Sequence, residues 1–264
     1  MGIHWTERLF IENAYLTGPS LEGRLEDAVD EVRGLKCIFS EHGVPEGTTV
    51  LDMACGVGRH SLALAKEGYR AVGVDISPTF IERAGELAEE RGVADNVDFR
   101  VGDIRDLGGL KEDYGEGFDA VVNLLTSHGY WDRATDRQIF RGALEVAKPG
   151  GVLVIHTVNR DYLVRNFREK DWSPIQEGRF MLIERRLDLE ESRMYNTWRY
   201  YEQRGEDLVH LSTVEVDHLV YSLHELKEQV EAGGWEAVSW YGGYGMQPLT
   251  TDSFVTVLVA RKPT

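Results

Sequence analysis

The sequence of 264 residues has little cysteine and no long apolar segment. It contains two cysteines, Cys37 and Cys55, whose separation does not match the spacing of metal ligands. No run of about 18 apolar residues, the length that a membrane-spanning helix needs, occurs in the chain. The opening residues MGIHWTERLF lack the basic and then apolar pattern of a secretion signal. We therefore expect a cytoplasmic protein with no metal site and no membrane partner.

Basic residues are also in deficit. The chain has 29 Lys and Arg against 45 Asp and Glu, which gives a net charge of −16. Nucleic acids and anionic membranes bind to clusters of Lys and Arg, and the sequence shows no such cluster. We therefore expect no nucleic acid partner and interpret the acidic residues as a solvated surface. The sequence gives no indication of the oligomeric state.

The sequence does contain the pattern of one α/β domain with added segments. Residues 1–45 are expected to form a helical segment, with helices over 4–18 and 21–42. From residue 46 strands and helices alternate, which predicts a doubly wound, mostly parallel sheet with helices on both faces. Strands are expected over 49–54, 71–76, 97–101, 118–125 and 151–157, and helices over 59–67, 79–91 and 135–147.

The alternation stops after residue 160. Residues 179–222 consist of β-rich runs separated by the turn-like EES and RGED, which predicts a small antiparallel sheet. A helix over 224–231 follows, with Ser222 and Glu225 spaced as a capping box. Strands over 237–241 and 254–260 end the chain and place a reversed strand at the sheet edge. We therefore expect a Rossmann-like domain built from 46–160 and 223–264, with a β insertion over 161–222 as a substrate lid.

The stretch VLDMACGVGRHSLALA, residues 50–65, joins an apolar strand, a glycine turn and the start of a helix. Glycines allow a tight turn and the close approach of a ligand, and a helix N-terminus offers free N–H groups. The stretch predicts a nucleotide-like ligand, and Asp75 at the end of the next strand suits its ribose hydroxyls. Both a dinucleotide and S-adenosylmethionine meet these requirements.

Three features separate the two ligands. A dinucleotide site expects a third glycine, under the pyrophosphate, where this chain has Ser61. S-adenosylmethionine has no pyrophosphate and does not need that glycine. Asp103 follows the third strand, where a carboxylate can bind an adenine amino group. Together with the reversed strand near the C-terminus, these features favour S-adenosylmethionine.

With these pieces in place, the chain resembles the class I S-adenosylmethionine-dependent methyltransferases. The matching segments are LDMACGVGRH, GVDIS, GDIRDL, FDAVVNLLTSHGYW, KPGGVLVI, HELKEQVEAGGW and VTVLVARKP, in that family's order and spacing. A small departure is Ala54, where the family often has glycine. The resemblance implies a seven-stranded methyltransferase fold and the following cofactor-binding residues: Asp52, Ala54, Gly56 and Gly58 at the methionyl end, Asp75 and Ile76 at the ribose and one adenine face, Asp103 and Ile104 at the adenine, and Asn123 and Leu124 beside the substrate.

The resemblance also implies methyl transfer to an N or O atom of a small-molecule acceptor. An insertion after the fifth strand is similar to that of small-molecule N-methyltransferases, including those that act on amino sugars and on glycine. Three alternatives stay open: a protein or RNA acceptor, a non-catalytic S-adenosylmethionine-binding protein, and an NAD-dependent oxidoreductase, which Ser61 disfavours.

A catalytic base is needed only if the acceptor has to lose a proton as it attacks. His128, just past the fourth strand, is the first candidate, with Tyr130 beside it as the second. His60 and His156 are weaker candidates, and ordinary packing is the more common role for each histidine. Among other residues, Tyr195, Trp198, Tyr200 and Tyr201 are expected in a substrate cage or in the core of the small sheet, Trp131 is placed like Tyr130, and Arg185 and Arg186 are expected at the surface.

Overall fold

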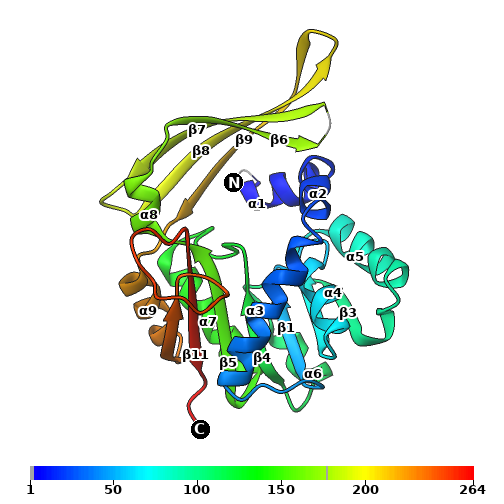
Figure 1. Ribbon diagram of the computed structural model, residues 1–264, viewed down its shortest axis with the longest axis vertical. Coiled ribbons are helices and arrows are strands. Elements are labelled where there is room, and N and C mark those ends of the chain that lie inside the picture. The colour runs from blue at the N-terminus through cyan, green and yellow to red at the C-terminus, as the bar shows by residue number, and fades with distance from the viewer. Residues whose placement is uncertain (1–2, 177) are drawn as a thin grey trace.

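The computed structural model describes residues 3–176 and 178–264, and its largest element is a seven-stranded sheet (Figure 1). The strand order is β10-β11-β5-β4-β1-β2-β3. β1 to β5 are mutually parallel and β11 runs antiparallel to both neighbours, so the expected sheet is confirmed. The reversed strand lies one position in from the edge that β10 forms. The strands are β1 Thr49–Met53, β2 Arg70–Asp75, β3 Val97–Val101, β4 Phe118–Asn123, β5 Ala147–Val158, β10 Glu236–Tyr241 and β11 Val255–Arg261.

Helices cover both faces of this sheet because its inner strands bury side chains on both sides. Within β4, Val121 packs on the face covered by α6, α7 and α9, whereas Ala120 and Val122 pack on the face covered by α3 and α4. The capping box of Ser222 and Glu225 at the start of α9 is confirmed. The helices are α3 Asp27–Glu41, α4 Arg59–Lys66, α5 Pro78–Glu90, α6 Gly108–Asp113, α7 Arg133–Val146 and α9 Leu223–Ala232.

The N-terminal helices begin and end at other residues than the sequence predicts. The chain forms α1 over Trp5–Glu7, a π-helical turn over Arg8–Glu12 and α2 over Ala14–Glu22 before α3 begins. The expected helix over 4–18 is interrupted at Asn13, whose side-chain amide donates to the carbonyl of Arg8 at 2.8 Å. Such a local side-chain bond competes with the regular backbone ladder, and it bends the segment.

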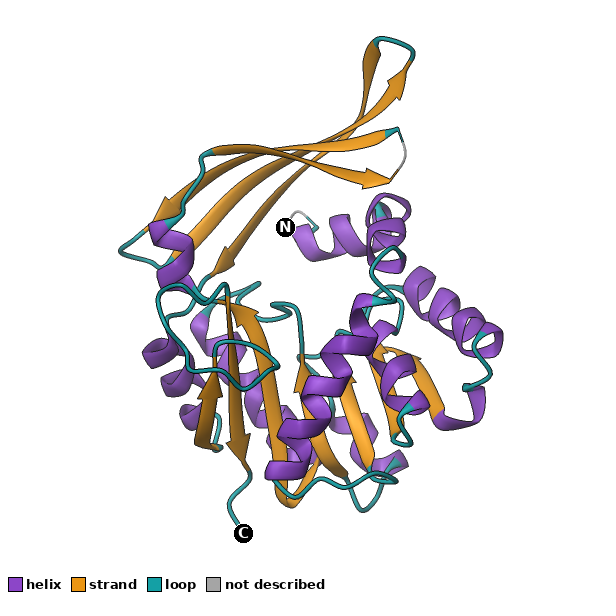
Figure 2. Cartoon of the chain, viewed as in Figure 1, coloured by secondary structure: helices purple, strands orange, loops and turns teal. Residues whose placement is uncertain are grey.

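A second, four-stranded sheet forms the insertion, in the order β6-β7-β8-β9, and every pair is antiparallel. Figures 1 and 2 show it extending across one end of the main sheet, with α1 and α2 beneath it. The strand β6 was not predicted from the sequence. It contains Pro174, which is tolerated because β6 lies at the edge of its sheet. The elements are α8 Arg160–Arg165, β6 Lys170–Gln176, β7 Arg179–Asp188, β8 Arg193–Arg204 and β9 Asp207–Leu219.

Candidate functional site

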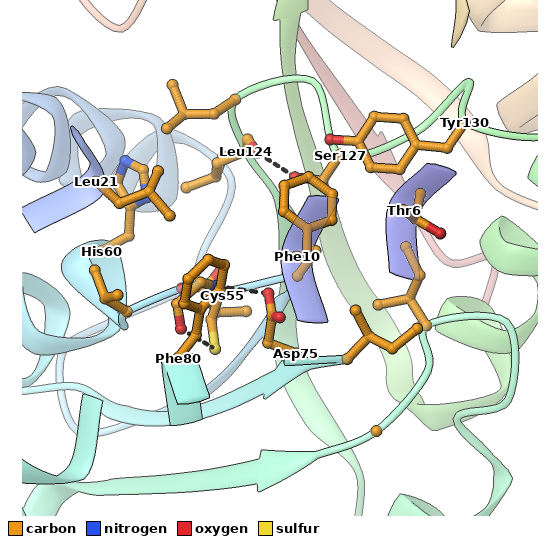
Figure 3. Close-up of a pocket in the computed structure, with 18 of the residues that line it drawn as sticks. Thr6, Phe10, Leu21, Cys55, His60, Asp75, Phe80, Leu124, Ser127 and Tyr130 are labelled. Atoms are coloured by element: carbon orange, nitrogen blue, oxygen red, sulfur yellow. Dashed lines mark hydrogen bonds between the residues drawn. The ribbon is translucent and has the colours of Figure 1, made fainter. Parts of the chain in front are cut away.

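A cavity of about 210 Å³ lies at the carboxyl ends of β1, β2 and β4, where doubly wound sheets bind their ligands. Figure 3 shows its lining, with Asp75 and Cys55 on one side and Phe10 and Tyr130 on the other. The residues expected at the cofactor that line this cavity, here called the first cavity, are Asp52, Ala54, Gly56, Asp75, Ile76, Asp103, Ile104 and Leu124.

The glycine turn closes one wall of the first cavity. Ala54, Gly56 and Gly58 all have positive φ, at 59°, 57° and 76°. The N–H of Gly56 donates to Asp75 Oδ2 at 2.8 Å, which ties the turn to the end of β2. Gly58 lies behind the cavity surface, and a Cβ there would come 2.6 Å from Phe99 Cζ. Glycine is therefore required at position 58 by backbone conformation and packing. This corrects the expectation that Gly58 lines the methionyl end.

Asp75, at the end of β2, is a buried carboxylate in the wall of the first cavity. Its Oδ1 accepts from the N–H of Ser77 at 2.9 Å and its Oδ2 from Gly56, so both oxygens are oriented by the backbone. Burial raises the pKa of this carboxyl to about 6, against the opposing effect of the two backbone hydrogen bonds. Each oxygen keeps a lone pair, and vicinal hydroxyls of a ribose match this arrangement of acceptors.

Asp103, past the end of β3, is oriented by a side chain instead. Arg105 donates to both of its carboxylate oxygens, with Nε at 3.0 Å from Oδ1 and 2.9 Å from Oδ2. Burial acts to raise the pKa of Asp103, but these hydrogen bonds outweigh it and the pKa is lowered. The Arg105 guanidinium also lies over the Trp131 ring, 4.6 Å from its centroid. The carboxylate is thus ionised and fixed at the far end of the first cavity.

A charged cluster that was not predicted from the sequence joins α3 to the glycine turn. Glu31 Oε2 accepts from Arg59 and lies 2.6 Å from His60 Nε2. Burial opposes ionisation of Glu31, but the hydrogen bond with His60 and the charge of Arg59 lower its pKa to about 2. Arg59 and His60 line the first cavity, and the buried Ser61 hydroxyl donates to Asp52 Oδ2 at 2.7 Å. No local pattern in the sequence indicates that Glu31, 28 residues before Arg59, is their partner.

The turn after β4 is strained. Leu125 and Thr126 both have positive φ, at 57° and 62°, which is uncommon for residues other than glycine and marks strain at a β-branched residue. His156 on β5 holds the turn: its Nδ1 accepts from the N–H of Leu125 at 3.4 Å, and its carbonyl accepts from Thr126 at 3.0 Å. Its ring stacks on Tyr244, with centroids 4.7 Å apart. His156 therefore positions this turn.

His128 does not line the first cavity. It is 1% exposed, and its Nδ1 donates to Asn123 Oδ1 at 2.9 Å, while the Asn123 amide donates to the carbonyl of Ser127 at 3.2 Å. Burial, helped by the neighbouring His218 and His156, lowers the pKa of His128 to about 3. These contacts correct two expectations, because His128 and Asn123 lie behind the cavity wall and fix the turn after β4.

A second cavity, of about 330 Å³, lies between the N-terminal helices, the turn after β4 and the insertion sheet. Phe10, Leu21, Leu125 and Tyr130 line both cavities and so form the junction between them. The sequence placed Tyr130 at this site but missed the others. The remaining residues that line the second cavity are Trp5, Leu9, Leu16, Thr17, Ser20, Thr126, Ile175, Met181, Trp198, Tyr200, Val216 and His218.

The aromatic residues of β8 divide between the two roles expected of them. Trp198 and Tyr200 line the second cavity, as a substrate cage requires. Tyr195 and Tyr201 are not among its lining residues; Arg186 lies over the Tyr195 ring, and Tyr201 packs edge-on against His210. Successive side chains of a strand point to opposite faces, which separates Trp198 and Tyr200 from Tyr195 and Tyr201. The pairing of β8 with β9 shifts register between Tyr200 and Tyr201. At the surface, Arg185 pairs with Asp171 and Arg186 with Asp188.

Two further features bear on the class of site. Within residues 3–176 and 178–264, no group of three or more His, Cys, Asp or Glu side chains is placed to hold a metal ion. In the same part of the chain no helix combines the length and the apolar character that crossing a bilayer demands. The first cavity instead fits S-adenosylmethionine, because the oriented carboxylates of Asp75 and Asp103 offer hydrogen-bond acceptors and Gly56 presents no side chain to the ligand.

Comparison with known proteins agrees with this geometry. Residues 45–211 match a family model described as a methyltransferase domain. An erythromycin 3''-O-methyltransferase of Saccharopolyspora erythraea is 37% identical over 153 residues, which cover 57% of this chain and 46% of that protein. A tRNA 5-carboxymethoxyuridine methyltransferase of Escherichia coli is 28% identical over 171 residues, which cover 64% and 61%. The matches thus span about half the length of these relatives.

Solved structures share the fold over nearly the whole chain. An S-adenosylmethionine-dependent methyltransferase from Clostridium acetobutylicum superposes with a TM-score of 0.75 at 15% identity, covering 89% of this chain and 91% of the other. A sugar N-methyltransferase from Streptoalloteichus gives a TM-score of 0.68 at 22% identity, covering 92% and 91%. At these identities the similarity concerns the fold, including the insertion.

Proposed function

The chain belongs to the methyltransferase-domain family, and we propose that it transfers the methyl group of S-adenosylmethionine to an oxygen or nitrogen atom of a small-molecule acceptor. The observation that carries this proposal is the junction of the two cavities at Phe10, Leu21, Leu125 and Tyr130. A ligand in each cavity meets the other at this junction, which is what a direct transfer between two bound molecules requires.

The first cavity is the proposed cofactor site. Asp75 accepts hydrogen bonds from the ribose hydroxyls, and Asp103 accepts from the adenine amino group between Ile76 and Ile104. Asp52 and the turn through Gly56 hold the methionyl end. When bound, S-adenosylmethionine supplies a methyl carbon made electrophilic by its sulfonium sulfur.

The second cavity is the proposed acceptor site, and its residues contribute mainly by positioning. Holding two reactants in line is worth roughly 7–11 kcal/mol of barrier in favourable cases. The aromatic side chains of Trp198 and Tyr200, with the strained turn at Leu125, restrict the acceptor and exclude water. Tyr130 lies at the junction, and burial raises the pKa of its hydroxyl, so it stays protonated and available as a hydrogen-bond donor.

A protein or RNA acceptor is the second candidate, since one relative is named for a tRNA substrate. Two observations favour a small molecule. The second cavity lies beneath the insertion sheet, and the net charge of −16 opposes binding of a polyanion. Retention of bulk tRNA on a filter at modest salt is the test of this alternative, and we expect none.

The test of the proposed function has two parts. Titration calorimetry should show binding of S-adenosylmethionine and S-adenosylhomocysteine but not of NAD, and binding of NAD alone would support an oxidoreductase. A metabolite library incubated with the protein and S-adenosylmethionine should then yield a product heavier by one methylene, together with S-adenosylhomocysteine. Cofactor binding without transfer to any metabolite, protein or RNA would support the non-catalytic alternative. A cytoplasmic location also remains a proposal, which cell fractionation tests.

A further inference from the structure

His218 is a polar residue on the apolar face of β9. Val214 and Val216 are buried on this face, with the exposed Glu215 between them, and His218 follows at the same two-residue spacing. Its side chain lines the second cavity. Within residues 3–176 and 178–264 no hydrogen-bond partner meets either ring nitrogen, so the ring is free to pair with a ligand.

The rest of the second cavity is uncharged. None of its described lining residues is an Asp, Glu, Lys or Arg, and most are aromatic or aliphatic. The acidic neighbour of His218, Asp217, is paired with Arg193. A carboxylate, phosphate or ammonium group on the acceptor would therefore be buried without an opposite charge, which is strongly unfavourable.

The polar atoms that line the second cavity indicate which polar group an acceptor can carry. Thr17 and Thr126 already use their hydroxyl oxygens in hydrogen bonds with Ala14 and Val158. The indole N–H of Trp5 is buried and has no partner among the described residues. The cavity also holds the hydroxyls of Ser20, Tyr130 and Tyr200 and the indole N–H of Trp198, beside the imidazole of His218. A hydroxyl group on the acceptor, which both accepts and donates, complements this set.

We propose that the second cavity takes an uncharged, largely apolar acceptor that presents a hydroxyl group to His218. This inference rests on the proposed function and specifies its acceptor. An alkyl amine is protonated at neutral pH and would carry a charge into the cavity, whereas a hydroxyl enters neutral. Burial lowers the pKa of His218 to about 4, so its ring is neutral at pH 7 and keeps a lone pair for the hydroxyl proton.

The same contact serves the transfer. A lone pair of the hydroxyl oxygen forms the new bond to the methyl carbon, and the electron pair of the broken carbon–sulfur bond stays on sulfur. The hydroxyl proton passes to the neutral ring of His218 and then to solvent. Since an oxygen acceptor must lose this proton, His218 acts here as a general base.

The test uses three ligands of matched shape: 2-naphthol, 6-hydroxy-2-naphthoate and 2-naphthylmethylamine. Each is titrated by calorimetry into protein saturated with S-adenosylhomocysteine. We expect 2-naphthol to bind, and the carboxylate and ammonium analogues to bind at least tenfold more weakly. His218→Ala should weaken naphthol binding by roughly tenfold, the effect of one lost hydrogen bond. His210→Ala is the control, because His210 is an exposed residue of the same strand and its partners, Thr213 and Tyr201, do not line the second cavity.

The outcomes separate this inference from the proposed function. The inference is overturned if the charged analogues bind as well as 2-naphthol, if 2-naphthol does not bind, or if His218→Ala binds it with unchanged affinity. In each of these cases the proposed function still stands as long as the protein binds S-adenosylhomocysteine. Failure of the wild-type protein to bind S-adenosylhomocysteine overturns the function itself. Unchanged affinity of His218→Ala for S-adenosylhomocysteine shows that the variant is folded, and His218→Gln, whose amide oxygen can accept the hydroxyl proton bond, should recover part of the naphthol affinity.

Discussion

Replacing Gly58 by alanine should destabilise the protein more than the addition of a single methyl group suggests. Gly58 has a φ of 76°, and a Cβ there would lie 2.6 Å from Phe99 Cζ and 3.1 Å from Ala84 Cβ. The left-handed conformation costs an L-residue about 1–2 kcal/mol, and overpacking a buried site costs about 1–3 kcal/mol. The loss of unfolded-state freedom returns about 0.4–1 kcal/mol. We expect the free energy of unfolding to fall by about 2–4 kcal/mol.

The matched control is Gly92→Ala. Gly92 has a φ of 66°, but no atom would lie within 4 Å of its Cβ, so only the conformational cost applies. Urea denaturation of both variants without ligand measures the difference, which we expect to be about 1–3 kcal/mol. Equal losses in the two variants would refute the packing argument. Replacing Phe99 by leucine in the Gly58→Ala background should recover part of the loss if the ring is the obstacle.

Further predictions concern the charged and buried groups of the site. Asp75→Asn should weaken S-adenosylhomocysteine binding by about 10- to 100-fold in calorimetry, because it removes charge-assisted hydrogen bonds; an unchanged affinity contradicts the assignment. The folded-state pKa of Asp75, about 6, lies above its usual value of 3.8, so protonation stabilises the ligand-free protein below pH 4 and this contribution is lost as the pH rises through 6. The ribose hydroxyls donate to the ionised form of Asp75, so cofactor affinity should fall by up to about tenfold per pH unit below 6. An affinity that stays constant from pH 7 to 5 argues against the assignment of Asp75 to the ribose. Glu31→Gln leaves the buried Arg59 charge unpaired and should cost about 3–5 kcal/mol in urea denaturation, whereas a loss below 1 kcal/mol means that the pair is solvated. His128→Ala should lower stability by about 2–4 kcal/mol, with no change in the shape of a pH–rate profile; loss of a limb near pH 6–7 restores the base role.

The parts of the molecule that could be predicted are those determined by residues close together in the sequence. The main strands, the glycine turn and the carboxylates Asp75 and Asp103 follow from motifs in which a residue's function depends on its immediate neighbours. His128 was predicted as a base because it follows β4 in the chain. Its orientation depends on a hydrogen bond with Asn123, and no spacing in the sequence reports that bond.

What the sequence did not predict comes from contacts between distant segments. Phe10, Leu21 and His218 meet at one site only because the insertion sheet folds over the N-terminal helices. Each of them has an ordinary alternative as a core or surface residue in its own segment. The strand β6 was not predicted either; its Pro174 is compatible with a strand only at a sheet edge, and edge position is a property of the whole sheet.

The central claim is that two adjoining cavities hold the methyl donor and its acceptor. A crystal structure of the protein soaked with S-adenosylhomocysteine tests it most directly. We predict the ribose hydroxyls on Asp75, the adenine amino group on Asp103, and the thioether sulfur directed at the junction formed by Phe10, Leu21, Leu125 and Tyr130. A ligand bound outside the first cavity, or one whose sulfur faces away from the second cavity, would contradict the account.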